Sequence, residues 1–241
     1  RFGFNSDSHD FWEVYNCIKK YYPIGIPRGE GGGIFFEYPG IKKLEDIVIE
    51  NVHNESNFSK RWVDFNKEVG LTLGKEVVGT TYGQAPSFSS YLILEKNEFQ
   101  NGCNFKQLQF AVSLIGKFFT IYGLDLTAIY EKEGKYTKTY FQSGIFTTSP
   151  FKEFKTDFEK LESLIRQKFY NYKMIPFAFG QKIINGLQVG YSDAEVCSVY
   201  MALFDDTIEI TNNFGYTHGL TARHTRADIY YGGDDWVKDK S

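Results

Sequence analysis

The sequence predicts an α+β fold: a mostly antiparallel sheet, an N-terminal helical segment, and one long amphipathic helix at about residues 150–171 that packs on the sheet. Three observations support this class. The segments follow one another as helices, strands, a long helix and further strands, without the regular strand–helix alternation of parallel sheets. The strand-like segments are short, rich in β-branched and aromatic residues, and separated by turn residues, as in antiparallel hairpins. The long helix keeps one face apolar for about five turns.

The N-terminal region is expected to begin with a helix. Residues 6–8 (Ser-Asp-Ser) offer N-caps, and apolar residues recur at helical spacing over residues 11–22 until Pro23 ends the helix. The glycine-rich segment 23–33 is predicted to be a loop that leads to a short strand at 34–38.

The next segment, residues 42–52, is compatible with either a helix or a strand. A second helix is predicted over residues 56–69, with Ser56 as its cap and Gly70 at its end. Its apolar stripe consists of Phe58, Trp62, Phe65 and Val69.

The middle of the chain predicts the antiparallel sheet. Strands are expected at residues 75–83, 87–96, 108–115, 117–123, 126–132 and 138–146. Glu133 and Gly134 are typical of a hairpin turn between the last two.

The long helix is the clearest helical prediction. Ser149 is its expected cap and Pro150 suits its first turn. Its apolar face consists of Phe151, Phe154, Phe158, Leu161, Ile165 and Phe169.

The last third of the chain is predicted to consist mainly of strands. They are expected at residues 174–179, 186–191, 197–204, 207–213 and 221–231. A capping box at residues 192–195 leaves a helix over 193–204 as an alternative, although a strand is favoured. The chain is expected to form one domain over residues 1–241, and a sub-boundary near residue 149 stays open.

Composition argues against several classes of protein. A net charge of −3 over 241 residues lacks the basic excess of a nucleic-acid binder or of a polybasic membrane anchor. The longest apolar runs, such as MIPFAF, fall far short of the roughly 20 residues that a membrane span needs. Aromatic residues make up 18% of the chain, which fits a recognition surface for sugars or proteins as well as a simple bias in composition.

No catalytic, cofactor or metal site is predicted from motifs. Cys17, Cys103 and Cys197 are too widely spaced for a disulfide framework or a zinc motif, and reduced thiols favour the cytoplasm. Secretion stays open because the chain begins with Arg1 rather than Met. The RGEGGG stretch lacks the Lys-Ser/Thr ending of a phosphate-binding loop, and no G-x-S-x-G or H-E-x-x-H motif occurs. His9 and His53 are expected to be solvated.

The stretch GYTHGLTARHTRADIYYGGDDW, residues 215–236, is the strongest candidate for a functional surface. As a strand it would place His224, Arg226 and Asp228 on one face, where a metal site or a general base is conceivable. Arg226 would repel a cation and separates the other two, so a contact patch is favoured. The candidate partner-binding residues are His218, Arg223, His224, Arg226, Asp228, Tyr231 and Trp236.

Three stretches resemble bacterial immunity proteins that are encoded beside polymorphic or contact-dependent toxins. They are FWEVYNCIKKYYPIGIP, SLIGKFFTIYGLDLT and GLQVGYSDAEVCSVYMALFDD, about a quarter of the chain. The resemblance lies in a composition rich in Lys, Asn and aromatic residues, in the predicted α+β class, and in the absence of a catalytic motif. It implies a cytoplasmic, non-catalytic protein that binds and blocks one toxin, and mild acidity would suit a basic toxin.

The leading expectation is therefore a protein-binding protein without a cofactor, whose partner is a protein rather than nucleic acid or membrane. One alternative is a hydrolase built from scattered carboxylates and the His218/His224 region. A third is a carbohydrate-binding protein, which would present a row of coplanar aromatic rings.

Overall fold

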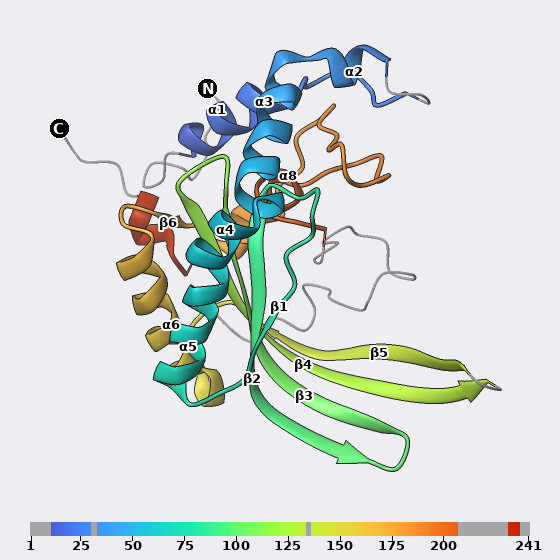
Figure 1. Ribbon diagram of the computed structural model, residues 1–241, viewed down its shortest axis with the longest axis vertical. Coiled ribbons are helices and arrows are strands. Elements are labelled where there is room, and N and C mark those ends of the chain that lie inside the picture. Colours follow the sequence, from blue (N-terminus) through green and yellow to red (C-terminus); the bar gives the residue numbers. More distant parts are fainter. Residues whose placement is uncertain (1–10, 30–32, 134–135, 207–230, 237–241) are drawn as a thin grey trace, which may run out of the picture.

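The chain folds around one sheet of six strands in a computed structural model that describes residues 11–29, 33–133, 136–206 and 231–236. The strands are β1 (Val77–Gly79), β2 (Ser87–Phe99), β3 (Gly102–Ser113), β4 (Phe118–Glu133), β5 (Tyr136–Thr147) and β6 (Lys173–Met174). They lie in the order β1-β2-β3-β4-β5 with antiparallel neighbours, and the short β6 runs parallel to β4. The predicted α+β class is confirmed (Figure 1).

Helices cover the upper half of the sheet in Figure 1. The α-helices are α1 (Trp12–Tyr21), α2 (Gly33–Glu37), α3 (Pro39–Val48), α4 (Glu55–Phe58), α5 (Asp64–Leu73), α6 (Lys155–Lys168), α7 (Phe177–Gly180) and α8 (Val199–Leu203). Two π-helical turns, η1 (Ile49–His53) and η2 (Ser59–Val63), flank α4, and 3-10 turns form at η3 (Lys152–Phe154) and η5 (Gly233–Trp236). Within the described ranges, every helix is too short or too polar to cross a membrane.

One face of the sheet packs against α5 and α6, which lie side by side in Figure 1. Because neighbouring residues of a strand point to opposite faces, Leu108, Phe110 and Val112 of β3 all face these helices. The helices contribute the apolar stripes that the sequence predicts. The buried members are Trp62, Phe65, Val69, Phe158, Leu161 and Ile165. The predicted packing of the long helix on the sheet is therefore confirmed.

The opposite face packs against α1, α3 and α8. Phe118, Tyr122 and Leu124 of β4 contact this second cluster, whose helical members include Ile18 of α1 and Leu44 of α3. The upper part of β3 and β4 is thus buried on both faces.

Below the helices, β2 to β5 continue as a projecting arm that turns away from the helical layer (Figure 1). The arm bends where β2 and β5, its two outer strands, each carry an extra residue. Leu94 of β2 has no partner between the pairs Ile93–Gln107 and Glu95–Lys106, and Gly144 of β5 has none between Asp125–Ile145 and Leu126–Ser143. Because a bulge bends its strand and increases its twist, two bulges at nearly the same height explain the bend.

One face of the arm is polar. Lys106 forms an ion pair of 3.2 Å with Glu95, and the Thr127 hydroxyl donates to Asn104 at 2.9 Å. Charged side chains along an outer strand discourage further strands from pairing with it, and Lys96 and Glu98 of β2 supply such charges.

The β2–β3 and β4–β5 hairpins confirm most of the predicted strands, but β4 differs from the prediction. The sequence indicates two strands on either side of residues 124–125, whereas β4 runs unbroken from Phe118 to Glu133. Gly123 is not a break in the strand but a point of close approach. A Cβ atom there would lie 2.7 Å from the Phe154 ring, so only glycine leaves room for that ring.

Two predicted strands are wrong because both segments are helical. Residues 34–37 belong to α2, which buries Phe35 and leaves Ile34 69% exposed, and Tyr38 is the N-cap of α3. Residues 197–204 contain α8, capped by Ser198 rather than by residue 192. All residues of α8 are buried, and a fully buried segment has no polar face whose period could distinguish helix from strand. The uncertain segment 42–52 is helical, as part of α3 and η1.

Helix ends also differ from the predictions. The second helix continues past Gly70 to Leu73 and ends at Gly74, which has a left-handed φ of 63°. The long helix begins at Lys155 after the 3-10 turn η3, and Ser149 does not cap it. In the last third, residues 174–179 form only the end of β6 and the helix α7, and 186–191 form no strand. The predicted segment 207–213 and all but the last residue of 221–231 lie outside the described residues.

We predict that Gly123→Ala destabilises the fold by about 1–3 kcal/mol, because the added methyl group overpacks against the buried Phe154 ring. Urea unfolding would measure the effect. Gly29→Ala is the control, since a Cβ atom there meets nothing within 4 Å. The loss caused by Gly123→Ala should be smaller in a Phe154→Leu background, where the ring is absent. Equal stability of Gly123→Ala and wild type would contradict the close approach.

Candidate functional site

A pocket of about 300 Å³ lies between the α3–η1 segment and two loops, at residues 83–84 and 190–191. Phe36 of α2 and Tyr22, which follows α1, complete its lining. The pocket lies at the margin of the hydrophobic cluster that covers one sheet face, so its walls are extensions of the core.

The helical wall combines an inner apolar row with an outer mixed row. Leu44 and Val48 are buried, four residues apart, on the side facing the core. Glu45, Ile49 and His53 follow at the same spacing one position later and line the exposed rim. This order of residues explains why one helix supplies both the apolar wall and the polar edge.

The wall ends in the π-helical turn η1. The Asn54 amide donates to the Ile49 carbonyl at 2.9 Å, five residues back rather than four. Such a wide turn is uncommon and recurs at functional sites. Here it sets the position of His53 relative to the loop across the pocket.

His53 connects the two sides of the pocket. Its Nε2 lies 2.6 Å from the Gly83 carbonyl oxygen, so Nε2 carries the proton and donates. In the neutral ring, Nδ1 then remains as an acceptor. The expectation that His53 is merely solvated missed this contact, because Gly83 is 30 residues away in sequence.

Two tyrosines form the aromatic part of the lining while their hydroxyl groups hold the fold together. Tyr22 donates to the Ala202 carbonyl at 3.0 Å, and Tyr191 donates to the Met201 carbonyl at 2.5 Å. Both carbonyls belong to the last turn of α8, where backbone acceptors lack partners within the helix. Burial raises the pKa of both phenols well above the usual value, so they are neutral near pH 7.

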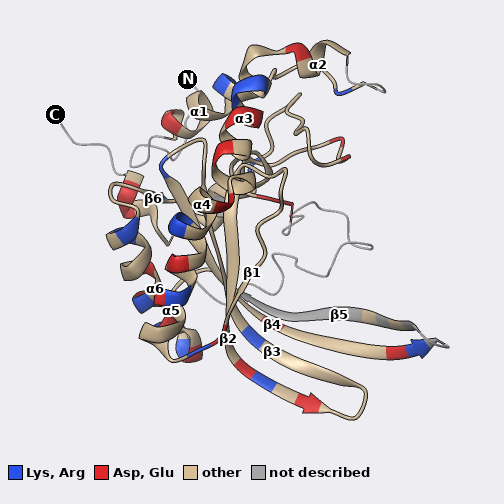
Figure 2. Cartoon of the chain, viewed as in Figure 1, with Lys and Arg blue, Asp and Glu red and all other residues tan. Residues whose placement is uncertain are grey.

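Basic and acidic residues occupy different parts of the α3–η1 segment. Lys42 and Lys43 lie near its N-terminus, whereas Glu45, Asp46 and Glu50 lie further along α3 and in η1 (Figure 2). Of these acidic residues, Glu45 lines the pocket.

The thiols are poorly suited to nucleophilic chemistry. Burial raises the pKa of Cys17 to about 12, and burial also raises the pKa of Cys197. The thiolate is the reactive form, so these groups are largely unreactive near pH 7. Among the residues that the structure describes, no three His, Cys, Asp or Glu side chains lie close enough together to hold a metal ion.

Five of the seven predicted partner-binding residues lie outside the described residues, and so does His9. The five are His218, Arg223, His224, Arg226 and Asp228. Their role in partner binding stays a prediction.

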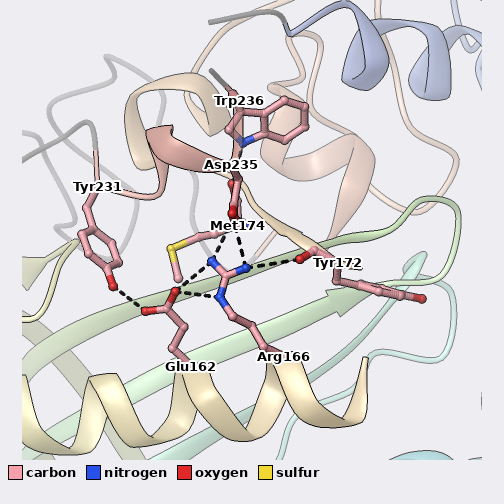
Figure 3. A network of polar contacts seen from close by, with 7 residues as sticks. All are labelled: Glu162, Arg166, Tyr172, Met174, Tyr231, Asp235 and Trp236. Atoms are coloured by element: carbon pink, nitrogen blue, oxygen red, sulfur yellow. Dashed lines mark hydrogen bonds and ion pairs between the residues drawn. The ribbon is translucent and has the colours of Figure 1, made fainter. Parts of the chain in front are cut away.

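The other two, Tyr231 and Trp236, contribute to the fold (Figure 3). Trp236 is only 3% exposed, and its indole N–H donates to the Met174 carbonyl at 2.8 Å. Tyr231 packs its ring edge against Phe158 and donates its hydroxyl to Glu162. Burial, together with this hydrogen bond, raises the pKa of Tyr231. Trp236 therefore anchors the chain near its C-terminus rather than forming an exposed contact.

Arg166 of α6 is the centre of the network in Figure 3. It makes two hydrogen bonds to the Asp235 carboxylate, at 3.3 and 2.9 Å, and its Nε donates to Glu162 at 2.9 Å. Asp235 also accepts from the Met174 amide at 2.7 Å. Burial lowers the pKa of Arg166, but hydrogen bonds to Asp235 and Glu162 outweigh that effect and raise it overall. The network attaches η5 to α6 and β6.

No protein-family model matches the chain, and neither a curated protein nor a solved structure is similar enough to count as a match. Function therefore has to be inferred from the contacts and charges of the chain itself.

We predict that Asp235→Asn lowers the free energy of unfolding by about 1–3 kcal/mol, because the charged acceptor of Arg166 and of the Met174 amide is lost. Urea unfolding would measure the loss. Asp234→Asn is the matched control, because Asp234 is an exposed neighbour in the same 3-10 turn. If the two substitutions lowered the free energy of unfolding equally, the network around Arg166 would contribute little to stability.

Proposed function

We propose that this protein is a non-catalytic binding protein that recognises a protein partner through the pocket beside α3. The pocket joins an apolar lining to a rim that carries the carboxylate of Glu45, and this combination is the observation that carries the proposal. Its titratable groups support binding rather than chemistry: His53, Tyr22 and Tyr191 all donate to backbone carbonyls. Recognition pockets are typically apolar with a few polar groups that orient the ligand.

The dimensions of the pocket favour a side chain of a protein partner. A volume of about 300 Å³ is at the lower limit of small-molecule sites. Protein interfaces commonly depend on one or two anchor side chains that fill such pockets, surrounded by a rim of weaker contacts. Ile49 lines the pocket, and Tyr82 contacts the ring of Tyr191 in its lining. Both side chains are exposed and extend the apolar surface around the opening.

We further propose that the partner is a cognate bacterial toxin and that binding neutralises it. The resemblance of three stretches to immunity proteins motivates this step, and an acidic rim suits a basic toxin. The thiols of Cys17, Cys103 and Cys197 are free, which is consistent with action in the reducing cytoplasm.

The two alternative functions gain no support from the described residues. The His218/His224 region of the hydrolase hypothesis lies outside them. For carbohydrate binding, the exposed Trp12 and its neighbour Tyr15 are nearly perpendicular, with an interplanar angle of 86°, rather than coplanar.

Affinity capture tests the proposal, with the protein as bait and the products of its neighbouring genes as candidates. We expect one of them to bind, and we expect Ile49→Gln to weaken binding at least about tenfold, which corresponds to ~1.4 kcal/mol. Ile49 lies on the rim and is 58% exposed, so its substitution should leave the fold intact.

The control is Leu71→Gln, a similar change at a site on α5 that is 85% exposed and away from the pocket. It should bind like the wild type. The proposal fails if no neighbouring gene product binds, if both variants bind equally well, or if the purified protein turns over a substrate.

A further inference from the structure

We propose that the pocket beside α3 selects an apolar group that carries a positive charge at its outer end, and that Glu45 recognises this charge. In a protein partner, that ligand is an apolar side chain next to a Lys or Arg. The inference rests on the proposed function and specifies the chemistry of the same site.

The side chains around the pocket offer mainly hydrogen-bond acceptors. The hydroxyl hydrogens of Tyr22 and Tyr191 and the Nε2 hydrogen of His53 are already donated to backbone carbonyls. Gln84 accepts from the Tyr82 hydroxyl at 3.2 Å, which leaves its amide NH₂ as a donor in the lining. Glu45 adds a carboxylate, which only accepts when ionised. A ligand with donor groups therefore matches these side chains better than one with acceptors.

The rim carries negative charge that is available to a ligand. Glu45 forms no ion pair within the part of the chain that the structure describes, and Asp46 beside it forms none there either. A cationic ligand would be attracted by these carboxylates, whereas an anionic ligand would be repelled by them.

The position of the charge defines the shape of the ligand. Leu44, Val48 and Tyr22 form the buried part of the lining, so the inner end of the ligand must be apolar. Glu45 is exposed at the rim, one residue from Leu44, so the positive group stays at the solvent-facing end. A cation in this position keeps most of its hydration, which avoids the cost of burying a charge.

Three probes of equal length test this chemistry: hexylamine, hexanol and hexanoate. Their binding to the intact protein would be measured by NMR titration at low salt, with shifts expected at residues 41–53. We expect hexylamine to bind about threefold to fivefold more tightly than hexanol, as for one exposed ion pair, and hexanoate to bind most weakly. Added salt should reduce the advantage of the amine.

Glu45→Gln should abolish the preference for hexylamine over hexanol and leave the affinity for hexanol unchanged. Glu68→Gln is the matched control, because Glu68 is exposed on α5 and its substitution changes the net charge equally. It should retain the preference. The inference is overturned if none of the probes binds the wild type, if hexanol or hexanoate binds as well as hexylamine, or if Glu45→Gln keeps the preference.

The probe titration tests the role of Glu45, and the capture experiment tests the protein-binding function, so either claim can be wrong without the other. Capture of a neighbouring gene product without selectivity for the amine would overturn the role of Glu45 and leave the binding function standing. Selectivity for the amine without any captured protein would support this pocket chemistry and count against a protein partner.

Discussion

Burial of the Trp62 indole joins the helical layer to the sheet. Trp62 is fully buried and stacks on Phe88 of β2, with ring centroids 5.3 Å apart, and it also contacts Phe110 of β3. Its N–H donates to the Ser89 carbonyl at 3.2 Å, so the one polar atom of the ring is satisfied inside the core. Trp62 lies in η2, directly before α5, so this contact holds η2 and the start of α5 against β2 and β3.

The bend of the sheet and the position of the pocket depend on how far the helices extend over the sheet. The upper half of β3 and β4 is buried on both faces, whereas the lower half of the sheet extends beyond α5 and α6 (Figure 1). The bulges at Leu94 and Gly144 bend the sheet at this limit. On the other face, the pocket forms where α3 and two loops meet at the edge of the covering layer. The site thus lies at the edge of the core that packs on the sheet.

Sequence patterns predicted the parts of the fold that are amphipathic. The stripes through Trp62 and Phe158 follow from helical periodicity, since one side of each of these helices is buried and the other is not. The β4–β5 hairpin follows from two strand-like segments separated by turn residues. The errors have the opposite cause. Helix α8 is buried on every side, and Gly123 signals a close approach to Phe154 rather than a turn.

The candidate site was harder to predict than the fold. The spacing of Glu45, Ile49 and His53 is visible in the sequence, but it has meaning only once residues 42–52 are known to be helical. The opposite wall comes from loops at 83–84 and 190–191, and no local pattern brings them to α3. Conversely, Tyr231 and Trp236 have the composition of a contact patch, yet both hold the chain end against α6 and β6.

We propose that a partner docks on the α3–η1 wall, which packs through Leu44 and Val48 against the hydrophobic cluster on one face of the sheet. Hydrogen exchange of the backbone amides, compared between the free protein and its complex with the captured partner, tests this claim most directly. Slower exchange should be concentrated in residues 41–53 and in the loops at 83–84 and 190–191. Protection confined to the projecting arm of β2 to β5, with residues 41–53 unchanged, would contradict it.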